Sequence, residues 1–366
     1  MRFLATYEVR CAAQDVEARA QAIAFEQSVE CPLAAIHEPR IVETIVGRVE
    51  RIEHVDEQRH RVTIALAAET VADDCAQFVN MAFGNASLWD DVRFVGLELP
   101  PAMLAAFAGP RHGLAGLRTL LQAPRRALTS AAMKPQGLDV DALARMAETL
   151  ALGGIDVIKD DHGIADQLYA PFPQRVVACH EAVQRAVQRT GRPVFYAPHL
   201  IGTPRALRRR AELARETGVR VVLVAPMLVG LPAFRDLVDE FPDFVYLAHP
   251  SFSGATRIAP PLLFGRLLRL FGADAPIFVN YGGRFGLTPD ECRLLADEAR
   301  APWGAITAAC PVPAGGMRLE RIPELLAFYG SDVMLLVGGD LLLAQGDALQ
   351  QRARGYVAAV HDVQPV

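Results

Sequence analysis

The sequence predicts an α/β protein in which a C-terminal (β/α)8 barrel, a TIM barrel, follows an α+β, ferredoxin-like N-terminal domain. Eight short apolar segments alternate with helical segments over roughly the last 235 residues, which is the layout of a closed barrel. Before them, strand-like and helix-like segments mix without this alternation, as in α+β domains. No GxGxxG follows the first apolar segment of the barrel region, which disfavours the competing doubly wound open sheet.

The composition is that of a globular protein and excludes several classes. Of the 366 residues, 51% are hydrophobic. The net charge of -5 argues against a general nucleic-acid binder. No segment supplies 18 consecutive apolar residues and the N-terminus lacks a signal-peptide layout, so we expect neither a membrane span nor secretion. The six cysteines are scattered without CxxC spacing, which argues against a zinc site or a disulfide scaffold and favours the cytoplasm.

The N-terminal domain is predicted to span residues 1–124. Apolar and alternating stretches predict strands at 3–9, 41–52, 61–67 and 92–99, and helices at 15–28 and 73–81. The prolines, glycines and alanines of 100–124 indicate a connecting region with some helix.

The barrel is predicted to span residues 125–366. Strands are expected at 128–133, 155–159, 193–198, 220–225, 244–249, 276–280, 309–314 and 333–337. Helices between them include 139–152, 204–217, 288–300 and 319–329. In such barrels the chemistry lies where the strands end, so the residues at these ends are candidates for the active site.

Polar residues and glycines stand at the strand ends. The polar ones are Lys134 after the first strand, Lys159, Asp160, Asp161 and His162 at the second, His199 at the third and His249 at the fifth. The seventh and eighth strands end in glycine pairs, Gly315 with Gly316 and Gly338 with Gly339. Bare backbone N–H groups before a helix can bind phosphate, although paired glycines also make ordinary tight turns.

The polar side chains allow more than one chemistry. A buried lysine loses its proton easily, so Lys134 or Lys159 could act as a base, form a Schiff base or become a carbamate. Lys159 could instead be the counter-ion of the neighbouring aspartates. Asp161 and His162 could hold a divalent ion, or simply meet water and cap the next helix. The histidines His199 and His249 could be ligand-binding or structural.

Several motifs, in order, resemble the large chain of RuBisCO, and the likeness covers nearly the whole sequence. KPQGL begins at Lys134, and Lys159 follows 25 residues later within GGIDVIKDDH. The other motifs are FEQSVECP, MAFGN, PPAMLAAFAGPRHGL, RRRAELARETGVRVVLV, PVPAGGM and LLVGG.

The resemblance implies roles for these motifs. Lys134 would shuttle a proton of the enolised substrate, and carbamylated Lys159 would bind Mg²⁺ with Asp161. Glu26 of FEQSVECP and Asn85 of MAFGN would complete the active site of a second subunit, so a homodimer with shared active sites is expected. The glycine pairs would hold phosphate, and the strand-five histidine would contact a substrate oxygen.

The chain departs from the family at positions tied to carboxylation and to one of its two phosphate sites. Gln136, His162, Pro250, Asn280 and Ala314 stand where the family has a second lysine, a metal-binding carboxylate, an arginine, a histidine and a serine. The mobile loop is shortened to YGGRFG, which lacks the catalytic lysine and offers Arg284 as a nearby cation. His162 would be a weak third ligand for Mg²⁺, which prefers oxygen. One preserved phosphate site implies a sugar monophosphate, not a bisphosphate.

The resemblance therefore identifies the chain as a RuBisCO-like, type IV, member and not as a carbon-fixing carboxylase. It implies an enzyme that acts through a metal-stabilised enolate on a sugar monophosphate. The reaction would be isomerisation or tautomerisation of the 5-methylthioribulose-1-phosphate type, or decarboxylation or transcarboxylation of a 3-oxo-sugar acid phosphate. Asn85 stands where the enolase branch has a lysine, which argues against that branch. The alternative is a catalytically inactive member that serves as a ligand-binding or stress-response protein.

Overall fold

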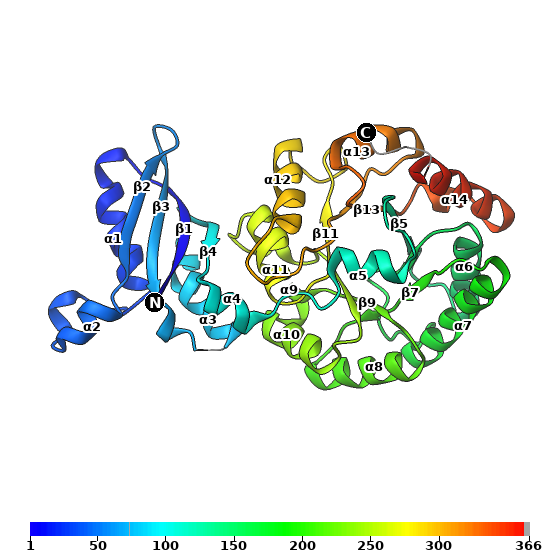
Figure 1. Ribbon diagram of the computed structural model, residues 1–366, viewed down its shortest axis with the longest axis horizontal. Helices are drawn as coiled ribbons and strands as arrows, with labels where there is room; N and C mark the ends of the chain where they lie inside the picture. Colours follow the sequence, from blue (N-terminus) through cyan, green and yellow to red (C-terminus); the bar gives the residue numbers. More distant parts are fainter. Residues whose placement is uncertain (73, 362–366) are drawn as a thin grey trace. The chain divides into compact units, whose positions relative to one another are not determined.

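The computed structural model describes residues 1–72 and 74–361, which divide into two compact units (Figure 1). The first unit comprises Met1–Ala108 and two later segments, Phe252–Leu263 and Gly304–Ile306. The second comprises Gly109–Ser251, Phe264–Trp303 and the chain from Thr307 onward. No helix within the described ranges is both long and apolar enough to cross a membrane.

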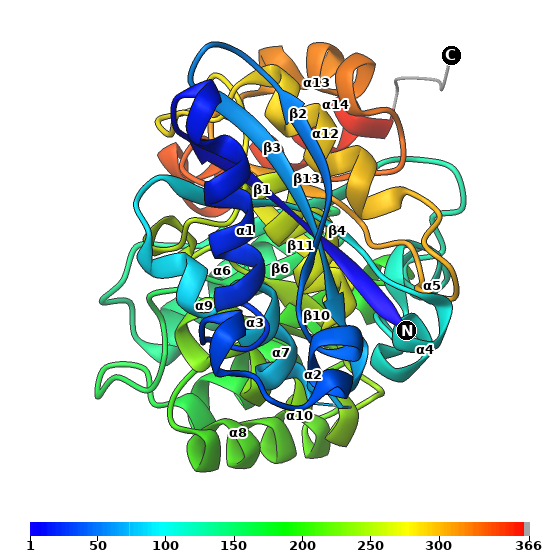
Figure 2. The same cartoon turned by 90° about the vertical axis from the view of Figure 1, so that its left-hand side faces the viewer.

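The first unit has the predicted ferredoxin-like topology. Its antiparallel sheet has the order β2-β3-β1-β4, with β1 at Arg2–Arg10, β2 at Arg48–His54, β3 at Arg59–Ala67 and β4 at Val92–Glu98. The helices are α1 at Val16–Glu26, α2 at Pro39–Thr44, α3 at Cys75–Phe83 and α4 at Pro101–Phe107. Helix α1 packs along β2 and β3 (Figure 2).

Alternation along β1 explains how this sheet meets its helices. Phe3 and Tyr7 are fully buried while the residues between them are partly exposed, the period of two of a strand with one face on a core. Helix α3 supplies the opposing rings: Phe78 lies 5.6 Å from Phe3 and Phe83 lies 6.2 Å from Tyr7, measured between centroids.

The predicted strand over residues 41–52 is wrong in its first half, because residues up to Thr44 belong to α2 and β2 begins only at Arg48. The β-branched residues suggested a strand, but Pro39 opens a helix, where its fixed φ is favourable. Gly47 then allows a close turn, since a Cβ there would lie 2.5 Å from the carbonyl oxygen of Ala24. Asp73, the first residue of another predicted helix, lies outside the described residues.

The second unit is the predicted barrel of parallel strands. They are β5 at Leu128–Met133, β6 at Val157–Asp160, β7 at Phe195–Ala197, β8 at His199–Leu200, β9 at Val221–Val224, β10 at Val245–Ala248, β11 at Ala275–Val279, β12 at Val312–Ala314 and β13 at Met334–Val337. The eight predicted strands are confirmed, and the third is split into β7 and β8 by Pro198, which has no N–H for the ladder. Across the split, the N–H of Leu223 donates to the carbonyl of Pro198 at 2.9 Å.

Helices surround these strands (Figure 1). They are α5 at Gly113–Leu120, α6 at Val140–Leu152, α7 at Phe172–Thr190, α8 at Pro204–Glu216, α9 at Pro226–Val229, α10 at Leu231–Glu240, α11 at Leu268–Leu270, α12 at Pro289–Arg300, α13 at Ile322–Tyr329 and α14 at Gly346–His361. A π-helical turn, Pro261–Leu267, precedes α11.

By its contacts, the segment 109–124 belongs with the barrel. Leu117 and Leu121 lie in the buried cluster that fills the barrel. The N–H groups of His112 and Gly113 donate to the buried carboxylate of Asp274 at 2.8 and 2.6 Å. The start of α5 is therefore anchored to the residue that precedes β11.

Candidate active site

Polar side chains meet where the barrel strands end. On four strands, a polar residue stands two positions after the last inward-facing core side chain. Because side chains alternate along a strand, this polar residue lies on the same face as the core side chain. These polar residues are Lys134, Lys159, His199 and His249, after Ala132, Val157, Ala197 and Leu247. The barrel thus brings together Lys134, Lys159 and His249, which the sequence analysis selected, with Asp161 and His162 beside them.

The carboxylate of Asp161 lies at the centre of this group. One of its oxygens, Oδ1, is 2.7 Å from Nζ of Lys134 and 3.3 Å from Nδ1 of His162. Burial alone would raise the pKa of Asp161, but its hydrogen bonds with His162 and Lys134 hold that pKa far below its usual range. Asp161 is therefore an anion at physiological pH, neutralised by the ammonium of Lys134.

Lys159 is almost completely buried, with 2% of its surface exposed. Burial and repulsion by Lys134 lower its pKa to about 8, although Asp161 and Asp160 act in the opposite direction. Its Nζ donates to the carbonyl oxygen of Asp160 at 3.0 Å. A substantial fraction of this amine is neutral slightly above neutral pH, so it can serve as a nucleophile or a base.

The composition contains an independent signal for both lysines. Among the 37 lysines and arginines, only Lys134 and Lys159 are lysines, and the other 35 are arginines. Arginine carries positive charge on a surface as well as lysine does, but it does not lose its proton at physiological pH. The chain retains a titratable amine side chain only at the barrel mouth.

We expect the reactivity of the Lys159 amine to rise through a midpoint near pH 8, about where its pKa lies. Because the unfolded chain holds this proton up to about pH 10.4, it binds more protons than the folded chain above pH 8. Stability from this group therefore increases as the pH rises over that window. Trace acetylation at stepped pH, read by mass spectrometry, checks the midpoint, with Lys134 in the same digest as internal reference. A midpoint above pH 10 would contradict a lysine desolvated in this way.

Asp160 has a structural role, because its side chain faces away from the mouth. Its Oδ2 lies 3.2 Å from Nε of Arg175 and accepts the backbone N–H of His199 at 3.0 Å. Its Oδ1 accepts the hydroxyl of Tyr196 at 2.8 Å. Asp160 and Arg175 are both fully buried, so this carboxylate locks the second strand to the third and to α7.

His249 offers a neutral N–H donor to a ligand. The backbone N–H of Ser251 donates to its Nδ1 at 3.2 Å, so the proton of the neutral ring is on Nε2. Burial, together with the charges of Lys159 and His162, lowers the pKa of His249 to about 2. Its ring stacks on that of His162, with centroids 4.2 Å apart and planes 13° from parallel.

His199, for which the sequence left a ligand-binding and a structural role open, lies at the mouth. Its ring is buried, and its Nδ1 lies 3.3 Å from the carbonyl oxygen of Ile164 and donates to it. Its Nε2 is buried and has no hydrogen-bond partner among the described residues. Burial, followed by the charge of Lys159, lowers the pKa of His199 to about 3. Its place two residues beyond the core residue Ala197 puts the ring on the inner face of the barrel.

Three of the four predicted phosphate-binding glycines leave open space above bare backbone, whereas an added Cβ at Gly316 would lie 3.1 Å from Cα of Gly283. Gly315 and Gly316 have φ of 92° and 67°, in the left-handed region that suits glycine. At Gly315, Gly338 and Gly339 an added Cβ would have no atom within 4 Å. Their strands, β12 and β13, are neighbours, and β13 pairs with β5, which ends before Lys134. An anion held by these glycines would lie toward β5, the strand that precedes Lys134.

Two other predicted positions have different surroundings. Arg284 is exposed and lies over the ring of Phe285, with its guanidinium carbon 5.1 Å from the centroid. Asn280 is buried and turned to α13, where its Oδ1 accepts the hydroxyl of Tyr329 at 2.6 Å. Val279, two positions beyond the core residue Ile277, faces the mouth instead.

Glu26 and Asn85 are neighbours in the first unit. The amide of Asn85 donates to Oε1 of Glu26 at 2.8 Å. Gln27 holds the surrounding loop, because its amide donates to the carbonyl of Met81 and its Oε1 accepts the N–H of Ala86, at 2.9 and 2.7 Å. The fold thus presents a carboxylate and an amide together, from positions 59 residues apart in the chain.

The residues at the mouth fit a divalent cation only if Lys159 is modified. Oδ1 of Asp161 and Nδ1 of His162 are 3.3 Å apart, close to the spacing of two adjacent ligands on one small ion. Within residues 1–72 and 74–361, no three histidine, cysteine, aspartate or glutamate side chains are grouped to hold a metal. A carbamate on Lys159 would supply the missing oxygen ligand.

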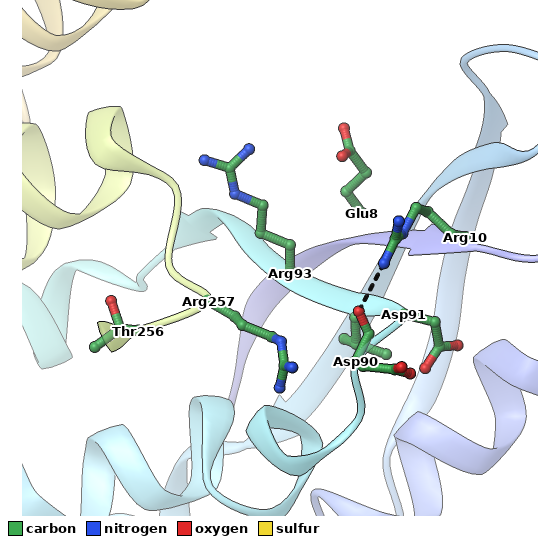
Figure 3. Close-up of a pocket in the computed structure, with 8 residues that line it drawn as sticks. Glu8, Arg10, Asp90, Asp91, Arg93, Thr256 and Arg257 are labelled. Carbon is green, nitrogen blue, oxygen red and sulfur yellow. Dashed lines mark hydrogen bonds between the residues drawn. The ribbon is translucent and has the colours of Figure 1, made fainter. Parts of the chain in front are cut away.

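A separate cleft of about 360 Å³ lies in the first unit (Figure 3). It is lined by Glu8, Arg10, Asp90, Asp91, Val92, Arg93, Thr256 and Arg257. Charges of both signs line it, and part of them is already engaged: Asp91 pairs with Arg19 at 2.6 Å, and Arg10 donates to the carbonyl of Asp90 at 2.9 Å. The lining contains neither a nucleophile with a neighbouring base nor a lysine, so the chemistry is assigned to the barrel.

Comparison with known proteins identifies the family of the chain. Residues 113–274 match the family described as the ribulose bisphosphate carboxylase large chain, catalytic domain. The chain is 52% identical to ribulose bisphosphate carboxylase-like protein 1 of Rhodopseudomonas palustris, over 98% of this chain and 97% of the relative. It is 49% identical to 5-methylthioribulose-1-phosphate isomerase of Rhodospirillum rubrum, over 98% and 96% of the two chains.

The fold has an equally close experimental counterpart. The crystal structure of a Rubisco-like protein from Rhodopseudomonas palustris superposes with a TM-score of 0.92 at 48% identity. The superposition covers 98% of this chain and 97% of the other. Both units are therefore shared with a protein of known structure.

Proposed function

The chain belongs to the RuBisCO large-chain family, as one of its RuBisCO-like members, and from this we propose that it isomerises a sugar monophosphate of the 5-methylthioribulose-1-phosphate type in the cytoplasm. The observation that carries the proposal is the group formed by Lys134, Asp161 and Lys159 at one barrel end, together with open space above Gly315, Gly338 and Gly339 at the ends of β12 and β13. A proton-transfer site beside a phosphate site suits a phosphorylated ketose. The 49% identity to an isomerase of that substrate favours it over decarboxylation.

We propose that Mg²⁺ is held by carbamylated Lys159 with Asp161, and more weakly by His162. When bound, such an ion would polarise a carbonyl oxygen of the substrate. The same oxygen of Asp161 contacts Lys134, so a cation there would take the place of its ammonium. Lys134 would thereby be released to act on the substrate.

The remaining steps follow from the other side chains. Lys134 would take the proton from the carbon next to the carbonyl and return it to the carbonyl carbon, so that the carbonyl moves by one position and atoms and charge balance in an isomerisation. The Nε2–H of His249 would donate to a substrate oxygen that gains negative charge. The backbone N–H groups of Gly315, Gly316, Gly338 and Gly339 would fix the phosphate, with Arg284 as an exposed cation in the loop after β11.

The test is turnover of 5-methylthioribulose 1-phosphate in heavy water, followed by NMR. We expect an isomer of the same composition that carries solvent deuterium next to the carbonyl. Protein stripped with a chelator should lose this activity and regain it with Mg²⁺ and bicarbonate. Full turnover after stripping would refute the metal site alone, whereas tight binding without any turnover would favour a ligand-binding protein.

Gly338→Ala should raise KM for the phosphorylated substrate roughly 10- to 100-fold while leaving the fold intact, since hydrogen bonds to a charged group contribute about 1.5–3 kcal/mol. An added methyl group has free space here in the protein alone, so the melting temperature should not change. The same methyl group would occupy the space of a bound phosphate. Gly355→Ala, on α14 and also in open space, is the matched control. An unchanged KM would place the phosphate elsewhere.

We propose that the minimal active unit is a homodimer in which Glu26 and Asn85 of one subunit serve the barrel of the other. Lys159→Met and Asn85→Ala proteins should each be inactive. Mixed by co-expression, they should recover up to roughly a quarter of wild-type activity, because half the dimers are mixed and each holds one intact site. If mixing restores nothing while both proteins form dimers, the sites are not shared.

A further inference from the structure

His199 occupies the barrel mouth by the same register rule as the residues assigned above. Its neighbour in the ladder, Leu223 on β9, belongs to the barrel core, so the His199 ring is on the inner face. Lys159 lies opposite Ala197, two residues before His199. The lysine and the histidine therefore project from adjacent strands on one face, and they are close enough for the charge of Lys159 to act on the His199 ring.

The His199 ring is held in one orientation. Its Nδ1 hydrogen points to the carbonyl of Ile164 at 3.3 Å, and its backbone N–H is tied to Asp160 at 3.0 Å. The one lone pair left is on Nε2, which is buried without a partner. A buried acceptor without a donor costs about 1–3 kcal/mol, so a donor is expected to reach it in the working protein.

Lys159, on the strand next to β7, carries the unused hydrogen-bond donors that the strand register places nearest to Nε2 of His199. An ammonium has three hydrogens and a neutral amine two, and the carbonyl of Asp160 accepts one of them. The lysine stem has freely rotating bonds, so Nζ can change partner without a backbone movement. Lys159 Nζ is thus a buried donor with hydrogens to spare, and His199 Nε2 is a buried acceptor with a free lone pair. Both lie on the inner face of the barrel at its mouth.

We propose that His199 is the positioning residue of Lys159: its Nε2 accepts a hydrogen bond from the Lys159 nitrogen and holds that nitrogen where it reacts with carbon dioxide. The inference rests on the proposed carbamate. In that reaction the Nζ lone pair bonds to the carbon of carbon dioxide, a C=O electron pair moves to oxygen, and Nζ releases a proton to solvent. The carbamate nitrogen keeps one hydrogen, which the imidazole can still accept. A neutral ring orients the amine without adding a negative charge that would favour the ammonium.

The experiment is carbamate trapping in three full-length proteins: wild type, His199→Phe and His199→Gln. Phenylalanine fills the space without an acceptor, whereas glutamine returns an amide oxygen. Each protein is equilibrated with labelled carbon dioxide and Mg²⁺, alkylated with a trialkyloxonium salt and digested. The chain has only two lysines, so mass spectrometry reads the Lys159 ester against Lys134 without interference.

We expect ester at Lys159 in wild type and in His199→Gln, and about tenfold less in His199→Phe, the effect of one lost hydrogen bond. His180→Phe, the same change on α7 away from the strand ends, should keep the wild-type level. Equal labelling of His199→Phe and wild type would overturn the proposal.

A crystal structure of the wild-type protein grown in bicarbonate separates the two hypotheses. If no carbamate forms in any variant, the proposed modification fails, but the position of Nζ still tests His199. Nζ within hydrogen-bond distance of Nε2 would support the positioning role. A water on Nε2, with Nζ still on Asp160, would overturn it, and this arm applies even if His199→Phe does not fold.

Discussion

Replacing Lys159 with methionine should reduce kcat/KM by roughly 10²–10⁴-fold, the range lost when a proton-transfer or metal-holding group is removed. Methionine resembles lysine in length and lacks the amine. Because Lys159 is buried and its pKa is already lowered to about 8, the apolar side chain should be tolerated without loss of stability. The measurements are steady-state turnover and a thermal melt of the same sample.

Lys159→Arg distinguishes the amine from its charge. Arginine keeps the positive charge but neither loses a proton at physiological pH nor forms a carbamate. If Lys159 works through its amine, Lys159→Arg should be as inactive as Lys159→Met. If the lysine is merely the counter-ion of the neighbouring aspartates, arginine should retain most of the activity, which would contradict the proposed role.

The barrel could be predicted because its strands are parallel and buried on both faces. Such strands appear in the sequence as continuous apolar runs, for example Val221–Val224 and Met334–Val337, which are easily located. The segment at residues 41–52 is apolar as well, yet a proline at a helix start changed its conformation. Local propensity could not reveal that Pro198 would split the third strand. The split depends on a contact between strands, in which the N–H of Leu223 donates to the carbonyl of Pro198.

The candidate site could be predicted in its membership but not in its contacts. Strand ends converge in any barrel, so Lys134 and His249 could be placed at one mouth from sequence alone. The partner of Asp160 could not be predicted from the sequence. That partner, Arg175, lies on α7, and its position in the sequence does not distinguish it from a surface arginine. The three consecutive residues Lys159, Asp160 and Asp161 also differ in direction. The side chains of Lys159 and Asp161 lie at the barrel mouth, whereas that of Asp160 faces away from it and is structural.

Asp160→Asn should lower the free energy of unfolding by about 3–5 kcal/mol, the usual effect of leaving one member of a buried ion pair without its partner. Asparagine has the same shape but presents an N–H₂ group to donors. Arg175, the hydroxyl of Tyr196 and the N–H of His199 all donate to this carboxylate. Urea unfolding should show a lower midpoint with an unchanged slope.

An exposed ion pair provides the control for Asp160→Asn, and a second substitution at Arg175 provides the rescue. Glu148→Gln removes the ion pair with Arg185, whose side chain is 53% exposed, and should change stability by less than about 1 kcal/mol. Adding Arg175→Met to Asp160→Asn should recover part of the loss, because the unpaired buried charge is removed. A loss at Asp160 no larger than at Glu148 would mean that the buried pair does not hold the second and third strands together. The positioning of His199 would then need another explanation, since its N–H relies on this same carboxylate.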